Sequence, residues 1–161
     1  VIAGNIQGIR LAGKRRTGYF NGEGENTMEK EFINPAGLFK HPAFTRIITV
    51  TGPAKFIFMA GQTPSDENFQ PVAPGDYRAQ YISIMETLEI QLKAVGATWD
   101  DVVFQRIYTL DIDKYLAVVR DPATPKYGNP DRPSANTLLG VTRLANPEFL
   151  IEIELVVATE P

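Results

Sequence analysis

Residues 76–110, DYRAQYISIMETLEIQLKAVGATWDDVVFQRIYTL, decide the fold class of this chain. Their first part carries apolar side chains at alternating spacings of four and three, which predicts one buried stripe on an α-helix over residues 76–95: Tyr81, Met85, Leu88, Leu92 and Val95. Gly96 is a typical helix stop. Residues 101–110 are rich in β-branched and aromatic side chains, which favours a strand. The stretch therefore predicts an α+β domain in which a helix packs on a sheet.

The strand at residues 101–110 is apolar on both faces. One face is expected to carry Val103 and Ile107, and the other Val102, Phe104, Tyr108 and Leu110. Since one helix covers a single face, the second face needs another helix, a closed barrel or a partner subunit.

The remaining elements follow on both sides of this stretch. Strands are predicted at residues 44–50 and 55–60 around a turn at Gly52-Pro53, a short helix at 113–121, and strands at 134–144 and 149–158. Residues 28–161 thus form a single predicted domain. Residues 1–27 are rich in glycine and lack a sustained period, so we interpret them as a leader or N-terminal extension. A basic arm at residues 14–16 is the alternative, although three basic residues are more typical of a solvated turn.

Composition excludes several classes of protein. The 161 residues carry a net charge of −3, so neither a nucleic acid nor a membrane surface is expected as a partner. The absence of Cys excludes disulfides and thiolate zinc sites, and makes the cytoplasm the expected location. His41 is the single histidine and is expected in a surface loop. Asp111 and Asp113 are spaced like metal ligands but lack the rest of a calcium loop, so they are interpreted as a helix start and no metal site is predicted there.

The last predicted strand contains two neighbouring carboxylates. In LIEIELVV, Glu152 and Glu154 share one face, while the alternate positions are apolar. Either this face is solvated, or a carboxylate lines a cleft. The spacing by itself favours the solvated face.

Five local patterns occur in an order and spacing that resemble the Rid family, also called YjgF and often labelled endoribonuclease L-PSP. They are Ala60-Gly61-Gln62-Thr63-Pro64, Ala79-Gln80, the turn at residues 96–103, the strand and helix start at 108–115, and Ile151-Glu152-Ile153-Glu154. The resemblance implies a chorismate-mutase-like α+β fold, in which two helices pack on a mixed sheet. It also implies a homotrimer whose sheets form a central barrel, with a small-molecule cleft at each subunit interface. Such an assembly would cover the second face of the strand at 101–110.

The resemblance also implies an activity, the hydrolysis of enamines and imines to a ketone and ammonia without a cofactor. In active members an arginine holds the substrate carboxylate, a glutamate handles water, and a serine and a tyrosine line the cleft. The glutamate corresponds to Glu152 in this chain. The other three positions have changed: Asn136 stands for the arginine, Ala60 for the serine, and Phe44 for the tyrosine. Their sequence neighbours Gly61 and Thr137 are expected to line the same cleft.

The change to Asn136 has a physical consequence, because an amide cannot replace a bidentate guanidinium. Losing such a pair costs on the order of 2–5 kcal/mol of binding free energy, which predicts a low affinity for small carboxylates. A cleft of this kind suits a larger or less charged ligand. Another arginine could instead have taken over, and Arg46, Arg106 and Arg132 are the candidates. Arg106 is the most interesting of them, although an ion-paired or snorkelling arginine is the more ordinary interpretation.

Three functions stay open at this stage. The first is a divergent deaminase that hydrolyses an enamine or imine C–N bond, with Glu152 as general base or water holder. The second is a non-catalytic ligand-binding or regulatory trimer. The third is a ribonuclease, which ranks last because the chain is acidic and lacks a catalytic histidine.

Overall fold

The computed structural model describes residues 27–161, and all but the last residue of the predicted leader lie outside the described residues. The elements run in the order β1 (Glu29–Ile33), β2 (Ile47–Thr51), β3 (Lys55–Gln62), α1 (Tyr77–Ala94), the 3₁₀ turn η1 (Trp99–Asp101), β4 (Val102–Thr109), α2 (Ile112–Arg120), β5 (Ala135–Gly140) and β6 (Ile151–Thr159).

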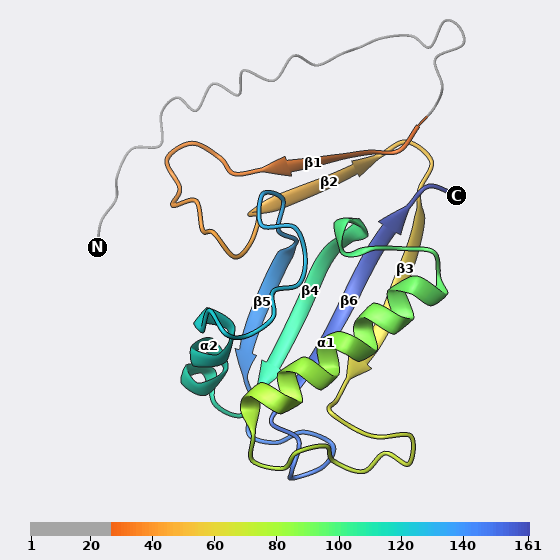
Figure 1. The fold of residues 1–161 in the computed structure, drawn as a ribbon. Coiled ribbons are helices and arrows are strands. Elements are labelled where there is room, and N and C mark those ends of the chain that lie inside the picture. Colours follow the sequence, from red (N-terminus) through yellow and green to blue (C-terminus); the bar gives the residue numbers. More distant parts are fainter. Residues whose placement is uncertain (1–26) are drawn as a thin grey trace, which may run out of the picture.

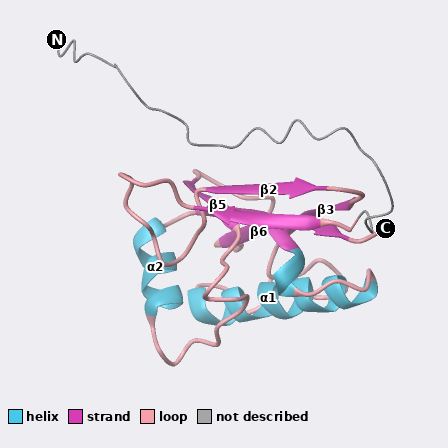
Figure 2. Cartoon of the chain, turned by 90° about the horizontal axis from the view of Figure 1, so that it is seen from above, coloured by secondary structure: helices cyan, strands magenta, loops and turns pink. Residues whose placement is uncertain are grey.

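The centre of the domain is a four-stranded mixed sheet in the order β3-β6-β4-β5. β4 and β5 run parallel, while β6 is antiparallel to both β3 and β4. Both helices lie on one face of this sheet (Figures 1 and 2). The predicted α+β class is confirmed, and within residues 27–161 no helix covers the other face of the sheet.

The core lies between α1 and the central strand β6. Four alternating side chains of β6 are no more than 1% exposed, namely Ile151, Ile153, Leu155 and Val157. The predicted helical stripe is buried at Tyr81, Met85, Leu88 and Leu92. The prediction is wrong for Val95, which is 40% exposed, because α1 ends at Ala94 and the C-cap turns away from the stripe. Gly96 has φ of 72°, which explains why glycine stops the helix here.

A buried amide ties α1 to the start of β6. The Gln80 side chain donates to the carbonyl of Glu148 at 2.8 Å and accepts from the backbone N–H of Leu150 at 2.9 Å. Gln80 itself is fully buried. Because these bonds hold the residues just before β6, they also set the position of the Glu152 backbone.

The strand predicted at residues 44–50 is present as β2, but it does not join the main sheet. It pairs with β1, which the sequence did not predict, in a separate two-stranded sheet. This ribbon lies beyond the end of the main sheet, on the side away from the helices (Figures 1 and 2). Gly52 turns the chain between β2 and β3 with φ of 82°, and a β-carbon there would collide with the carbonyl oxygen of Thr27.

The two faces of β4 differ from the predicted alternation at one point. The register shifts between Val102 and Phe104, so Val102 and Val103 are both buried. Val102 was predicted to share a face with Phe104, and the bulge is the reason that it does not. Phe104 and Tyr108 lie on the face away from the helices and stay half-exposed.

That outer face of the sheet exposes large apolar side chains within the described chain. Phe58 of β3 is 79% exposed, Phe56 is 50% exposed, and Leu139 of β5 is 37% exposed. The apolar pattern of β4 predicted cover for this face, and among residues 27–161 these large apolar side chains stay exposed.

Candidate carboxylate site on the outer face

Glu152 is the second residue of β6 and points to the outer face of the sheet. Its register partner on β4 is Tyr108. On the other side it lies against Gly61 of β3, where a β-carbon would collide with the Glu152 carboxylate and lie 2.9 Å from its Cδ. The β3–β6 register shifts between Met59 and Gln62, so Ala60 and Gly61 lie in this irregular stretch. Gly61 is therefore the residue that leaves room for the carboxylate.

The surroundings of Glu152 favour its neutral form. Partial burial raises the pKa of the Glu152 carboxyl, and the negative charge of Glu154 two residues further along raises this pKa as well. A carboxyl group shifted in this direction is suited to take up and return a proton nearer to neutral pH than an ordinary glutamate. Of the two interpretations of the glutamate pair, this favours a functional carboxylate at Glu152.

Glu154 has a different role, because it forms an ion pair with Arg106 across the β4–β6 ladder. The same guanidinium lies 3.4 Å from the Tyr108 hydroxyl and packs over the ring of Phe104 at 5.4 Å from its centroid. The ion-paired interpretation of Arg106 is thus confirmed. Its charge is already matched by Glu154, although it lies on the same face as Glu152.

Asn136 and Glu152 do not lie side by side within one chain. Asn136 is in register with Gln105 of β4 and thus with Leu155 of β6, which is part of the core, whereas Glu152 is in register with Tyr108. β6 begins at the end of the sheet where β3 and β4 finish, and β5 begins at the opposite end (Figure 1). Asn136 and Glu152 are therefore on opposite faces and three register positions apart.

Some of the other predicted site residues lie beside Glu152, and others lie beside Asn136. Thr137 is in register with Arg106 and so lies on the outer face, while Ala60 and Gly61 accompany Glu152. Phe44 accompanies Asn136, whose Nδ2 donates to the carbonyl of Ala43 at 3.2 Å. The structure thus brings the predicted site residues together in two groups rather than one.

The loop that carries Phe44 is held firmly against the start of β5. Thr45 is 2% exposed, its N–H donates to Ser134 at 3.2 Å, and its hydroxyl donates to the carbonyl of Pro133 at 2.7 Å. His41 stacks on Phe44 with ring centroids 4.6 Å apart, and its Nδ1 accepts from the N–H of Ala43. His41 is therefore a half-buried residue in a loop, and its predicted loop position is confirmed.

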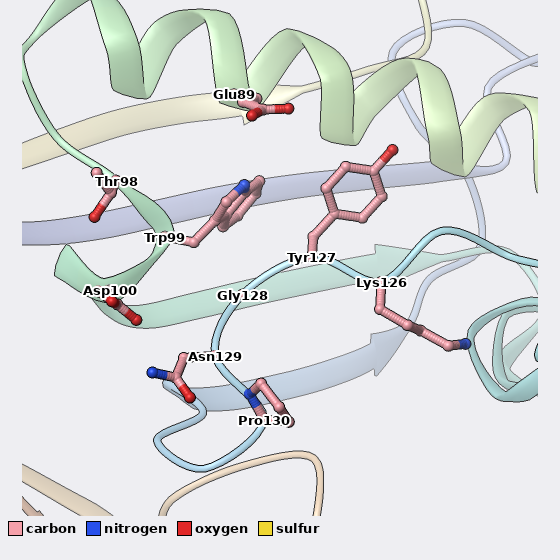
Figure 3. A pocket seen from close by; sticks show the side chains of 9 residues that line it. All are labelled: Glu89, Thr98, Trp99, Asp100, Lys126, Tyr127, Gly128, Asn129 and Pro130. Carbon is pink, nitrogen blue, oxygen red and sulfur yellow. The ribbon is translucent and has the colours of Figure 1, made fainter.

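Sequence reasoning missed a hollow on the helix side of the molecule (Figure 3). It encloses about 640 Å³ between the end of α1 and the loop before β5, with Trp99 and Tyr127 as its aromatic walls. The indole nitrogen of Trp99 is buried and has no hydrogen-bond partner among the described residues. None of the predicted site residues lines this hollow, so it is separate from the site around Glu152.

Metal binding has little support within residues 27–161. No group of three or more His, Asp or Glu side chains in this part of the chain is placed to hold a metal ion.

Asp111 is the N-cap of α2 and accepts from the N–H of Lys114 at 3.1 Å, so its prediction as a helix start is confirmed. Across residues 27–161, no helix is long and apolar enough to cross a membrane.

Solved structures with the same arrangement of strands and helices define the class of protein. A Rid-family protein of unknown function from Yersinia pestis matches with a TM-score of 0.68 and 28% identity, over 81% of this chain and 98% of that one. RidA from an Antarctic Psychrobacter matches with a TM-score of 0.54 over 74% of this chain and 97% of that one, and at 17% identity it shows the fold alone. The predicted chorismate-mutase-like (YjgF) fold is confirmed.

The sequence comparisons agree with this class. The 3-aminoacrylate deaminase RutC of Acinetobacter baylyi is 30% identical over 126 residues, which are 78% of this chain and 95% of that protein. A RutC family protein of Pyrococcus abyssi is 30% identical over 105 residues, 65% of this chain and 80% of that protein. A family model described as Endoribonuclease L-PSP matches residues 41–159. The chain belongs to this endoribonuclease L-PSP family, the Rid or YjgF family.

Proposed function

We propose that this protein is a Rid-type hydrolase that converts an enamine or imine to a carbonyl compound and ammonia, with Glu152 handling the water. One observation carries the proposal: the carboxylate of Glu152 is partly buried against Gly61, and burial and Glu154 raise its pKa. The 3-aminoacrylate deaminase among its relatives supports this reaction class.

The reaction needs one group that both takes up and gives back a proton. The carboxylate of Glu152 removes a proton from water while the water oxygen adds to the imine carbon, which yields a carbinolamine. Return of that proton to the nitrogen completes the neutral carbinolamine. Glu152 then takes the hydroxyl proton and passes it to the nitrogen as the C–N bond breaks, so that ammonia leaves, the carbonyl forms and Glu152 ends as the carboxylate. An enamine enters the same sequence after protonation at carbon converts it to the imine.

A complete site around Glu152 requires more than one copy of the chain. Asn136 lies on the other face of the sheet, three register positions from Glu152, and Phe44 accompanies Asn136, so within one chain these side chains do not converge on one small substrate. The exposed outer face with Phe58 offers a surface on which copies can pack. We therefore propose a homotrimer whose outer sheet faces meet in a barrel and whose substrate sites lie between subunits.

The substituted positions leave a second candidate function, a non-catalytic ligand-binding or regulatory trimer. The observation that favours it is that the amide of Asn136 donates to the carbonyl of Ala43, and so serves the loop rather than a ligand. Ala60 and Phe44 add no polar group that could replace it. A protein with these residues could retain the pocket without the reaction.

A rate assay separates the two candidates. 2-Aminoacrylate, 2-iminobutanoate and a larger enamine without a carboxylate are generated in situ, and release of the carbonyl product is followed. We expect acceleration of at least one substrate, and a loss on the order of 100-fold or more in Glu152→Gln, the range for a general base. The matched control is Glu86→Gln, since Glu86 is exposed on α1, which covers the face of the sheet opposite to Glu152.

Two outcomes of this assay would contradict the proposed function. Glu152→Gln acting at the wild-type rate would refute the role of Glu152. If no substrate is accelerated but saturable binding is measured, the non-catalytic function replaces the deaminase.

A further inference from the structure

Three arginines were candidates for binding a substrate carboxylate, and the structure separates them by their partners. Arg106 is paired with Glu154, and Arg132 lies 4.0 Å from Asp100 and over the ring of Phe32. Arg46 has no carboxylate within 4.0 Å among residues 27–161. Of the three, Arg46 alone offers an unmatched positive charge within the described chain.

The guanidinium of Arg46 is held in place by uncharged groups. Its Nη2 donates to the carbonyl of Phe39 at 3.0 Å, and its Cζ lies 5.4 Å from the ring centroid of Phe44. Its backbone N–H donates to the Asn34 side chain at 3.2 Å. One guanidinium donor is thus used for positioning, and the others stay free for a planar anion.

The position of Arg46 relates it to Asn136. Arg46 directly follows Thr45, which forms hydrogen bonds with the two residues just before β5. Asn136 donates a hydrogen bond to the carbonyl of Ala43 in the same loop. The positive charge that Asn136 cannot supply is therefore present on the loop that Asn136 anchors. Arg46 also packs on Phe44, one of the residues expected to line the cleft.

We propose that Arg46 is the carboxylate-binding residue of the site, presented by one copy of the chain to Glu152 of another. The inference rests on the proposed deaminase function and names its substrate class: enamine or imine acids that carry a carboxylate. Within one chain, Arg46 directly follows Thr45, which is bonded to Ser134 just before β5, whereas Glu152 is in register, through Tyr108 of β4, with Leu139 near the end of β5. The two residues can therefore meet around a small substrate only in an assembly.

The first test compares substrates with and without a carboxylate. For 2-iminobutanoate, we expect Arg46→Gln to raise KM by on the order of 30-fold or more with little change in kcat, as loss of a charge-assisted pair predicts. Arg46→Lys should recover part of the loss. An imine without a carboxylate should be hydrolysed equally by wild type and Arg46→Gln. The control is Arg120→Gln, on the exposed last turn of α2.

The second test asks whether the two residues come from different copies. Subunits carrying Arg46→Gln and subunits carrying Glu152→Gln, each with its own tag, are co-expressed and purified through both tags. We expect these mixed oligomers to regain about a third of wild-type activity at low 2-iminobutanoate concentration, since every mixed trimer has one interface of three with both native residues. If the residues served one site from one chain, every chain would lack one of them and no activity would return.

The failure of this inference differs from failure of the proposed function. Arg46→Gln with an unchanged KM for 2-iminobutanoate overturns the role of Arg46 while the loss in Glu152→Gln still stands. If instead Glu152→Gln keeps the wild-type rate, the deaminase proposal is wrong, and binding of 2-oxobutanoate is measured by calorimetry. Binding that disappears in Arg46→Gln supports the carboxylate site, and equal binding refutes it.

Discussion

At the scale of single residues, the functional potential of Glu152 comes from what surrounds it. Gly61 provides space for the carboxylate, and partial burial with the nearby Glu154 makes ionisation harder. Glu154, with the same side chain two positions later, is instead matched by Arg106. Identical residue types on one face of one strand therefore have different chemistry because their neighbours on β3 and β4 differ.

A substitution at Glu154 tests this account of Glu152. In Glu154→Gln, a negative charge is removed and the guanidinium of Arg106 loses its partner, and both changes favour the ionised form of Glu152. We therefore expect the pKa of Glu152 to fall, measured by NMR titration of carboxyl-labelled glutamate. The acidic limb of the rate profile should move to lower pH in the same variant.

The matched control for this titration is Glu31→Gln, since Glu31 lies on β1 in the separate two-stranded sheet. It should leave the titration of Glu152 unchanged. An unchanged or increased pKa of Glu152 in Glu154→Gln would contradict the electrostatic explanation.

At the scale of elements, the loop before β2, which we propose as part of the site, is held in place because it is bonded to the start of β5. Thr45 and Asn136 provide these bonds, and Phe44, His41 and Arg46 stack on one another above them. A rigid support of this kind reduces the ordering cost of binding a ligand.

Thr45→Val tests the support of this loop. Valine keeps the shape of the side chain but leaves the carbonyl of Pro133 without its donor, which is 2.7 Å away in the native protein. We expect a loss of about 1–3 kcal/mol in the free energy of unfolding, measured in urea, together with faster hydrogen exchange in the loop. In the control Thr49→Val, the hydroxyl bonds only to the exposed Glu31, so the loss should stay below about 0.5 kcal/mol. Equal losses in both variants would show that the Thr45 bond does not support the loop.

At the scale of the whole molecule, the two faces of the main sheet differ in how far they are buried. The helices bury one face, while the other exposes Phe58 and Phe56 and contains the Arg106–Glu154 pair. A face of this kind fits an interface between copies, with an apolar centre and ion pairs that set orientation.

Light scattering tests the assembly directly. We expect the wild-type chain to have the mass of a trimer, and Phe58→Asp to dissociate it, because a carboxylate would be buried at the interface without a partner. The control is Ile90→Asp, which changes a side chain that is 68% exposed on α1, on the opposite side of the sheet. A monomeric wild-type protein, or a trimer that persists in Phe58→Asp, would contradict the proposed assembly.

Much of the fold could be predicted from local patterns. The stripe from Tyr81 to Leu92, the stop at Gly96, and the alternating side chains of β6 each depend on residues close in sequence, and the structure confirms them. Val95 and Val102 were assigned wrongly because a helix end and a bulge interrupt the periods. β1 was missed because its strand character depends on pairing with β2, 14 or more residues later.

The sequence by itself therefore determined the α+β class, the family resemblance and the retained Glu152, because these depend on periodicity and on short motifs. Only the tertiary structure decided which charges are matched, since Arg106 meets Glu154 over a separation of 48 residues and Asn136 meets Ala43 over 93. It also decided that Asn136 and Glu152 lie on opposite faces of one sheet, three register positions apart. Contacts between distant segments depend on how the elements pack, and no local pattern of residues encodes that packing.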